Sequence, residues 1–152
     1  MDDLSFVMAT ERLPGYEHLT ARWTWEEHCQ AMAQENTLYL IAQSADLDDV
    51  GFVILQPIAD HHEGTKLKRI CVSTPGRGVG GALLSAVISW VFTTLHTDRL
   101  WLDVFVDNEH ARRAYRRVGF SEDGILRSAY RNADGLLVDR VLMSLLRSER
   151  RA

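Results

Sequence analysis

The most chemically distinctive segment of the sequence packs four glycines into six positions, with one charged residue and one valine between them: Gly76, Arg77, Gly78, Val79, Gly80 and Gly81. Residues 66–72 before it have high β propensity, and residues 82–95 after it contain no glycine or proline. We therefore expect a strand, a bend and a long helix. The first amides of a helix lack intrahelical partners and carry the positive end of its dipole, and glycines let a bulky anion approach them. The segment predicts a site for a phosphate or diphosphate, with Arg77 nearby; the alternative is a tight turn that binds nothing.

The spacing of these glycines excludes two common nucleotide-binding motifs. A P-loop requires Lys and then Ser or Thr after its last glycine, whereas Gly81 is followed by Ala82. A dinucleotide-binding fingerprint requires GxGxxG at the start of a βαβ unit and an acidic residue closing the next strand. The bend has neither that spacing nor that position in the chain.

Composition limits the class of protein. A chain of 152 residues, 46% hydrophobic and 25% charged, is expected to fold as one globular domain, residues 1–152. The net charge of −4 gives no support to a nucleic-acid partner. No apolar run reaches membrane-spanning length, and the N-terminal residues lack the pattern of a signal peptide, so we expect no membrane partner. Cys29 and Cys71 fit no metal spacing, so we expect reduced, buried cysteines, no metal and a cytoplasmic protein.

Hydrophobic periodicity predicts a mixed α/β (α+β) order of elements: strand, helix, helix, strand, strand, strand, helix, strand, helix, strand, strand. The predicted strands are residues 5–10, 37–43, 50–58, 66–72, 99–106, 122–131 and 136–146. The predicted helices are a turn at 16–20, then 25–34, the helix after the bend, and 108–118. Strands 66–72 and 99–106 flank a helix, so this crossover should make them parallel.

Three aromatic residues gather in the segment between the first elements: Tyr16, Trp23 and Trp25. They either line a pocket for a substrate or fill the core beneath a helical hairpin.

Three motifs together resemble the GNAT N-acetyltransferase superfamily over nearly the whole chain: LKRICVSTPGRGVGGALL, RLWLDVFVDNEHARRAYRRVGF and GILRSAYRNADGLLVDRVLMSLL. Within it, they look like the branch that includes ribosomal-protein N-terminal alanine acetyltransferases. The resemblance implies a mixed, mostly antiparallel sheet of about six to seven strands, splayed between the fourth and fifth strands and flanked by about four helices. It also implies that acetyl-CoA binds where those two strands separate.

The resemblance assigns roles to particular residues. The amides from Gly76 through Gly81 would hold the CoA pyrophosphate. The strand edge formed by Ile70, Cys71 and Val72 would pair with the pantetheine arm, and an amide near Cys71 or Val72 would stabilise the oxyanion. Asn108 matches the family's residue near the pantetheine. The superfamily pattern Q/R-x-x-G-x-G/A places Pro75 at its first position, so Arg77 is the candidate for the missing charge.

Tyr115 matches the family's tyrosine that protonates the departing thiolate; the alternative is one more core aromatic on an apolar helix face. An amine must lose a proton before it attacks, which calls for a base or a chain of waters. The superfamily often has a glutamate in the fourth strand, but Lys66, Lys68 and Arg69 occupy that region here. Three side chains, Glu63, His62 and Asp103, remain candidates beside water.

The expected activity is therefore transfer of an acetyl group from acetyl-CoA to an amine, either a protein N-terminus or a small molecule. Two alternatives stay open. One is a CoA-binding or acetyl-CoA-binding regulatory module without turnover, and the other is a homodimeric scaffold that associates through its final strand and a stripe of small residues.

Overall fold

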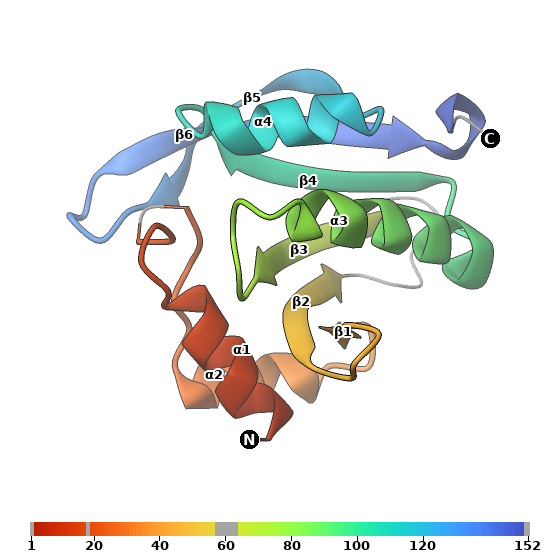
Figure 1. Cartoon of the computed structure of the whole chain (residues 1–152). Coiled ribbons are helices and arrows are strands. Elements are labelled where there is room, and N and C mark those ends of the chain that lie inside the picture. The colour runs from red at the N-terminus through yellow and green to blue at the C-terminus, as the bar shows by residue number, and fades with distance from the viewer. Residues whose placement is uncertain (1, 18, 57–63, 151–152) are drawn as a thin grey trace.

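The computed structural model describes residues 2–17, 19–56 and 64–150 (Figure 1). Its helices are α1 (Asp3–Glu11), α2 (Trp25–Met32), α3 (Val79–Trp90), which continues as a π-helical turn (Val91–Leu95), and α4 (Glu109–Arg117), with a final 3-10 turn (Arg147–Glu149). Its strands are β1 (Leu38–Gln43), β2 (Asp49–Gln56), β3 (Thr65–Val72), β4 (Arg99–Phe105), β5 (Ser121–Arg131) and β6 (Leu137–Leu146).

The described strands form one six-stranded sheet in the order β1-β2-β3-β4-β6-β5. Every neighbouring pair is antiparallel except β3 and β4, which are parallel as the crossover predicts. That parallel pair is joined at only two positions, Thr65 with Leu100 and Lys66 with Trp101. Beyond them the two strands diverge toward their C-terminal ends (Figure 1). The sheet therefore has the mixed, mostly antiparallel, splayed form that was expected, and the fold class is confirmed.

The prediction of a first strand at residues 5–10 is wrong, because these residues belong to helix α1. Asp2 caps that helix, since its carboxylate accepts a hydrogen bond from the amide of Ser5 at 2.9 Å. Leu4 and Val7 are buried at helical spacing and pack in a cluster with Phe52 of β2. Tertiary burial thus outweighs the β propensity of a short apolar run. The strands that splay, expected to be the fourth and fifth, are consequently the third and fourth.

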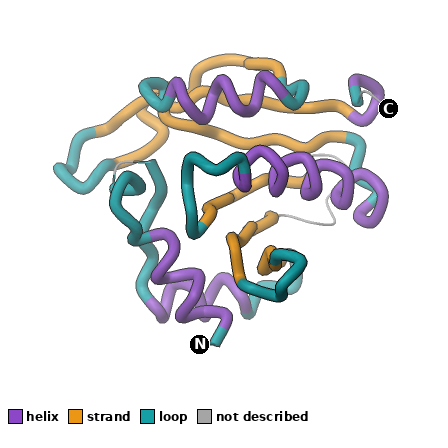
Figure 2. The backbone as a smooth tube through the Cα atoms, in the orientation of Figure 1, coloured by secondary structure: helices purple, strands orange, loops and turns teal. Residues whose placement is uncertain are grey.

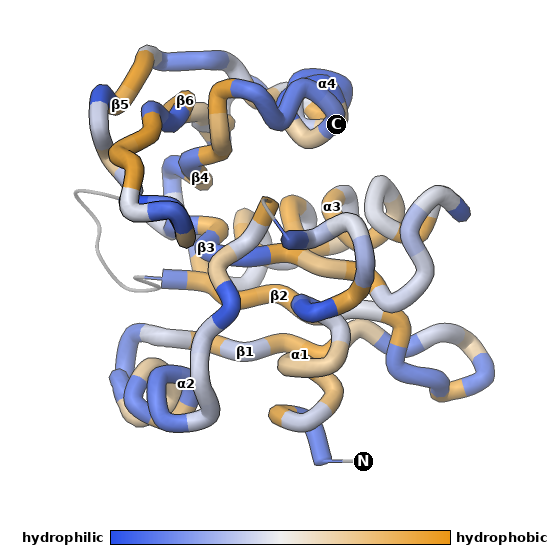
Figure 3. The backbone as a smooth tube through the Cα atoms, turned by 90° about the vertical axis from the view of Figure 1, so that its left-hand side faces the viewer, coloured by the Kyte–Doolittle hydropathy of each residue, from blue (hydrophilic) through white to orange (hydrophobic). Residues whose placement is uncertain are grey.

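The alternation of side chains along β2 separates two cores. Phe52 and Ile54 face the cluster formed with α1, while Val53 and Leu55 face α3. Viewed from the side, β1, β2, α1 and α2 lie in one half of the molecule, and β4, β5, β6 and α4 in the other (Figure 3). The opening between β3 and β4 lies between these halves.

Two further features are the start of α2 and the state of the cysteines. Thr24 begins α2 with a capping box, in which its hydroxyl accepts from the amide of Glu27 and the Glu27 carboxylate accepts from the amide of Thr24. Both cysteines are free, but only Cys71 is buried; Cys29 is exposed, contrary to expectation. Among the described residues, no helix is both long and apolar enough to cross a membrane.

Candidate active site

The glycine-rich bend leads from the end of β3 into α3 (Figure 2). Gly76 and Gly78 have φ of 84° and 78°, a backbone region that side chains disfavour. Gly78 is the N-cap of α3 and provides no side chain to cap it. The first intrahelical bond is donated by Ala82 to the carbonyl oxygen of Gly78, at 3.1 Å. The amides before Ala82 therefore stand at the positive end of the helix without helical partners.

The space around this bend is open. A Cβ atom placed on any of its four glycines would meet no other atom within 4 Å. Pro75 and Arg77 are both exposed beside it. The bend thus combines amide donors with room for a bulky anion, as the sequence predicts.

The edge of β3 that faces the opening is set by the direction of its hydrogen bonds. Ser73 donates to the carbonyl oxygen of Val50 at 3.0 Å, and Cys71 is registered with Phe52 on β2. Hydrogen bonding alternates along an antiparallel ladder, so Ile70 and Val72 turn their backbone groups away from β2. Of the two predicted oxyanion donors, only the amide of Val72 faces the opening.

A side chain from the N-terminal region occupies that edge. The hydroxyl of Tyr16 accepts a hydrogen bond from the amide of Val72 at 3.1 Å and donates one to the carbonyl oxygen of Val72 at 3.2 Å. Burial raises the pKa of Tyr16, so the phenol is protonated at neutral pH and is able to donate. The Tyr16 hydroxyl thereby makes the two hydrogen bonds that a neighbouring strand would make with Val72.

A cavity of about 460 Å³ fills the opening between β3 and β4. Its walls come from both strands, α4, the segment between α1 and α2, and the hairpin of β5 and β6; they include Tyr16, Ile70, Asn108 and Tyr115. A second cavity of about 790 Å³ adjoins it, because Thr20, Ala21 and Tyr130 line both. Of the three aromatic residues expected at a pocket or in the core, Tyr16 lines the cavity, Trp23 stacks on Arg69, and Trp25 is 45% exposed.

Tyr115 and Asn108 come together on α4. The Asn108 side chain caps the helix by accepting from the amide of Ala111 at 3.2 Å. Tyr115 lies two turns further along, in ring contact with Phe120. Burial raises the pKa of Tyr115 well above its usual value, so its phenol holds a proton at neutral pH. The same helix thus presents an amide side chain and a proton donor to the cavity.

Asp103 of β4 is held as an anion in the wall of the same cavity. It is ion-paired with Lys66 and with Arg140. Burial alone would raise the pKa of Asp103, but the hydrogen bond from Lys66 and the charge of Arg140 outweigh it and lower the pKa. A carboxylate that is already neutralised by two cations is a poor proton acceptor, so the geometry disfavours Asp103 as a general base.

The remaining candidate bases, His62 and Glu63, lie outside the described residues. Cys71 also lines the cavity, but burial raises the pKa of its thiol to about 12, which keeps it from acting as a nucleophile at neutral pH. Within residues 2–17, 19–56 and 64–150, no group of three or more His, Cys, Asp or Glu side chains is placed to hold a metal ion.

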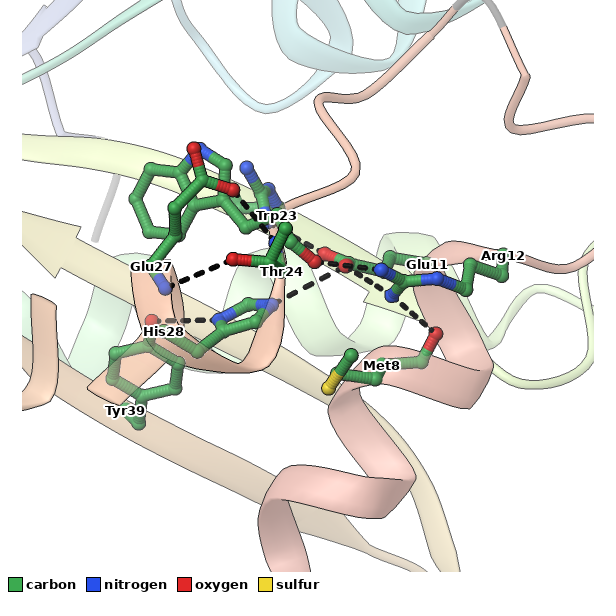
Figure 4. A network of polar contacts seen from close by, with 9 residues as sticks. Met8, Glu11, Arg12, Trp23, Thr24, Glu27, His28 and Tyr39 are labelled. Carbon is green, nitrogen blue, oxygen red and sulfur yellow. Dashed lines mark hydrogen bonds and ion pairs between the residues drawn. The ribbon is translucent and has the colours of Figure 1, made fainter. Parts of the chain in front are cut away.

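A buried polar network behind β3 was not anticipated from the sequence (Figure 4). The carboxylate of Glu11 binds Arg69 at 2.6 Å, Arg12 at 2.7 Å and His28 at 3.2 Å. The other ring nitrogen of His28 lies 2.9 Å from the hydroxyl of Tyr39. Desolvation lowers the pKa of His28 against the opposing effect of Glu11, so the ring is neutral at pH 7. Arg69, which also lines the cavity, is thus ion-paired with a carboxylate that it shares with Arg12.

Comparison with known proteins identifies the family and some relatives of this chain. The profile of the acetyltransferase (GNAT) family matches residues 6–120. The spermine/spermidine N(1)-acetyltransferase of Bacillus subtilis (strain 168) is 30% identical over 86 residues, covering 52% of this chain and 57% of that protein. The L-amino acid N-acetyltransferase AaaT of Escherichia coli (strain K12) is 36% identical over 77 residues, covering 49% of this chain and 47% of that protein. The chain thus spans about half the length of the curated relatives that it matches.

The fold is shared with solved structures. The spermidine N-acetyltransferase from Vibrio cholerae, solved in complex with CoA and spermine, aligns with a TM-score of 0.82 over 97% of this chain and 91% of that chain, at 22% identity. The family match begins within α1 and includes the splayed strands, the glycine bend and α4. The chain belongs to the acetyltransferase (GNAT) family.

Proposed function

We propose that the chain is an N-acetyltransferase that moves the acetyl group of acetyl-CoA onto a primary amine, with residues 1–152 acting as one catalytic domain. Membership of the family supports this activity. The observation that carries it is the cavity between β3 and β4, which is lined by the protonated Tyr115 and by β3, the strand that leads into the bend of unpaired amides.

In this proposal the amides from Gly76 through Gly81 bind the diphosphate of acetyl-CoA, assisted by Arg77. The open space over the glycines and the positive helix end support this. The pantetheine arm pairs with the cleft-facing edge at Ile70 and Val72, next to Cys71. Asn108 positions this arm from the start of α4.

The chemistry then needs one bond made and one broken. The neutral amine attacks the carbonyl carbon of the thioester and forms the C–N bond, and the C–S bond breaks. The amine nitrogen loses one proton to solvent, and the departing sulfur gains one from Tyr115, which solvent reprotonates. The pKa of such a thiol is about 8.5, so protonation assists its departure at neutral pH. The amide of Val72 stabilises the negative charge on the carbonyl oxygen once Tyr16 has released it.

The acceptor is an amine, and the named relatives act on two kinds, polyamines and amino acids. A protein N-terminus, as the resemblance to ribosomal-protein acetyltransferases predicts, stays a third candidate. We also propose a cytoplasmic location, which the free cysteines support. A homodimer stays a prediction, and no observation favours the regulatory module without turnover.

The test is release of free thiol from acetyl-CoA in the presence of amino acids, polyamines and peptides with different N-termini, with the acetylated amine identified by mass spectrometry. The proposal expects thiol and acetylated product in equal amounts with at least one class. Tight binding of acetyl-CoA without any product would instead identify the regulatory module.

A further inference from the structure

We propose that the acceptor carries a carboxylate or an equivalent anionic group beside its amine, and that Lys68 binds this group. The inference rests on the proposed function and narrows its substrate class. It starts from the distribution of charge around the cavity between β3 and β4.

The chain contains two lysines, Lys66 and Lys68, among seventeen basic residues. Both lie on β3 and both line this cavity. Arg140 of β6 faces them, so three cations meet one carboxylate, Asp103. Arg69 also lines the cavity, but its guanidinium is held by Glu11, a carboxylate that it shares with Arg12.

These four charged groups differ in whether they have an ion-pair partner. Asp103 binds both Lys66 and Arg140, and Arg140 also stacks on the ring of Phe105 with its guanidinium carbon 4.4 Å from the ring centroid. Lys68 lies 5.8 Å from the centroid of Trp23, and no carboxylate among the described residues is within ion-pair distance of it. Within the part of the chain that the structure describes, the uncompensated charge of the cavity is therefore concentrated at Lys68.

This charge acts on both parts of an acceptor. A carboxylate gains an ion pair with Lys68, an exposed residue of the cavity wall. An amine held nearby has its protonated form disfavoured by like charges, which increases the neutral, reactive fraction. Lys68 itself shows this effect, because desolvation and the adjacent Lys66 lower its pKa. The cluster thereby reduces the need for a dedicated base.

A polyamine lacks the compensating group. Each of its ammonium ions is repelled by the cluster, and Asp103 is already engaged by two cations. The adjoining cavity is close to balance, with Glu17, Asp107 and Asp139 against Arg22 and Arg131, so it does not reverse this selection.

The inference is tested with pairs of amines that differ only in the carboxylate: L-leucine with 3-methylbutylamine, and L-phenylalanine with 2-phenylethylamine, with spermidine as the polyamine. We expect kcat/KM at least tenfold higher for each amino acid than for its decarboxylated partner and for spermidine. Lys68→Gln should lower this preference about tenfold, mainly through KM. The matched control is Arg127→Gln, which removes an exposed charge of β5 outside both cavities and should leave the preference unchanged.

A binding measurement separates this inference from the proposed function. Because the chain has two lysines, labelling with an amine-reactive reagent followed by mass spectrometry reports on Lys66 and Lys68 directly. 4-Methylpentanoate at millimolar concentration, which keeps the carboxylate of leucine but has no amine to consume the reagent, should protect Lys68, and 3-methylbutanol should not. Protection without any thiol release would support the acceptor class and contradict turnover. Thiol release with equal or better rates for spermidine or the decarboxylated amines would overturn the inference and leave the acetyltransferase intact.

Discussion

The hydroxyl of Tyr16 closes the edge of β3 by bonding both backbone groups of Val72, a residue 56 positions later in the sequence. The same edge is the one to which we assign the pantetheine arm and the oxyanion. On that proposal, Tyr16 and acetyl-CoA compete for the amide donor and the carbonyl acceptor of Val72, and binding of the coenzyme requires the tyrosine to move.

Tyr16→Phe should separate these two effects. Loss of the hydroxyl leaves the amide and carbonyl of Val72 without this partner, which should lower the free energy of unfolding of the free protein by about 1–3 kcal/mol. The variant should bind acetyl-CoA more tightly, by up to about tenfold, because nothing competes for the edge. Denaturant unfolding and calorimetric titration measure the two quantities. Equal or weaker binding of acetyl-CoA would show that Val72 is not part of its site.

Tyr115→Phe tests the proton donor. We expect kcat to fall by about 10²–10⁴-fold with little change in the affinity for acetyl-CoA, because the ring and its contact with Phe120 remain. Wild-type turnover in this variant would remove Tyr115 from the mechanism. The matched control is Tyr130→Phe, which removes a tyrosine hydroxyl from the part of the same cavity wall that β5 forms.

Asp103→Asn tests a role in charge balance against a role as base. The pKa of Asp103 is lowered in the folded state, so its contribution to stability is present above its ordinary value of 3.8 and is lost as the pH falls through the folded value. The variant should unfold more easily than wild type at pH 7, by about 1–3 kcal/mol, and this gap should close below pH 3.8. The pH dependence of kcat should keep its shape. If the variant instead lost the acidic limb of that profile, Asp103 would be the base.

Glu11→Gln tests the buried network behind β3. Removing this charge leaves Arg69 buried beside Trp23 without its carboxylate, which should cost about 3–5 kcal/mol in the free energy of unfolding. Asp46→Asn, a change of the same kind at an exposed position, should have little effect. A cost that is similar in both variants would contradict a special role for Glu11.

Local sequence patterns predicted most of the helices and strands. They also predicted the parts of the candidate site that lie within a single element. The glycine bend and the helix that begins near Asn108 follow from patterns within a few residues, and the resemblance to the family singled out Asn108 and Tyr115. The network of Glu11, His28 and Arg69 joins three separate elements, so periodicity within any one of them gives no sign of it. The same holds for the contact between Tyr16 and Val72. Asp2, which caps α1, is a local signal for this helix in the sequence.

The two lysines illustrate a second limit of prediction from sequence. In the sequence, Lys66 and Lys68 stand out only as replacements for an expected glutamate. The electrostatic role of the two lysines depends on Arg140 and Asp103, which reach the same cavity from β6 and β4. Charge balance is a property of the assembled cavity and not of any one strand.

The central claim is that the amides of the bend bind acetyl-CoA, and calorimetric titration of wild type, Gly80→Leu and Gly124→Leu tests it most directly. At Gly80 and Gly124 alike, a Cβ atom meets nothing within 4 Å, so neither change should impair folding. We predict that wild type and Gly124→Leu bind acetyl-CoA equally and that Gly80→Leu binds at least tenfold more weakly, because its side chain blocks the approach of the diphosphate. Equal affinity in all three folded proteins, or no heat with wild type, would contradict the account.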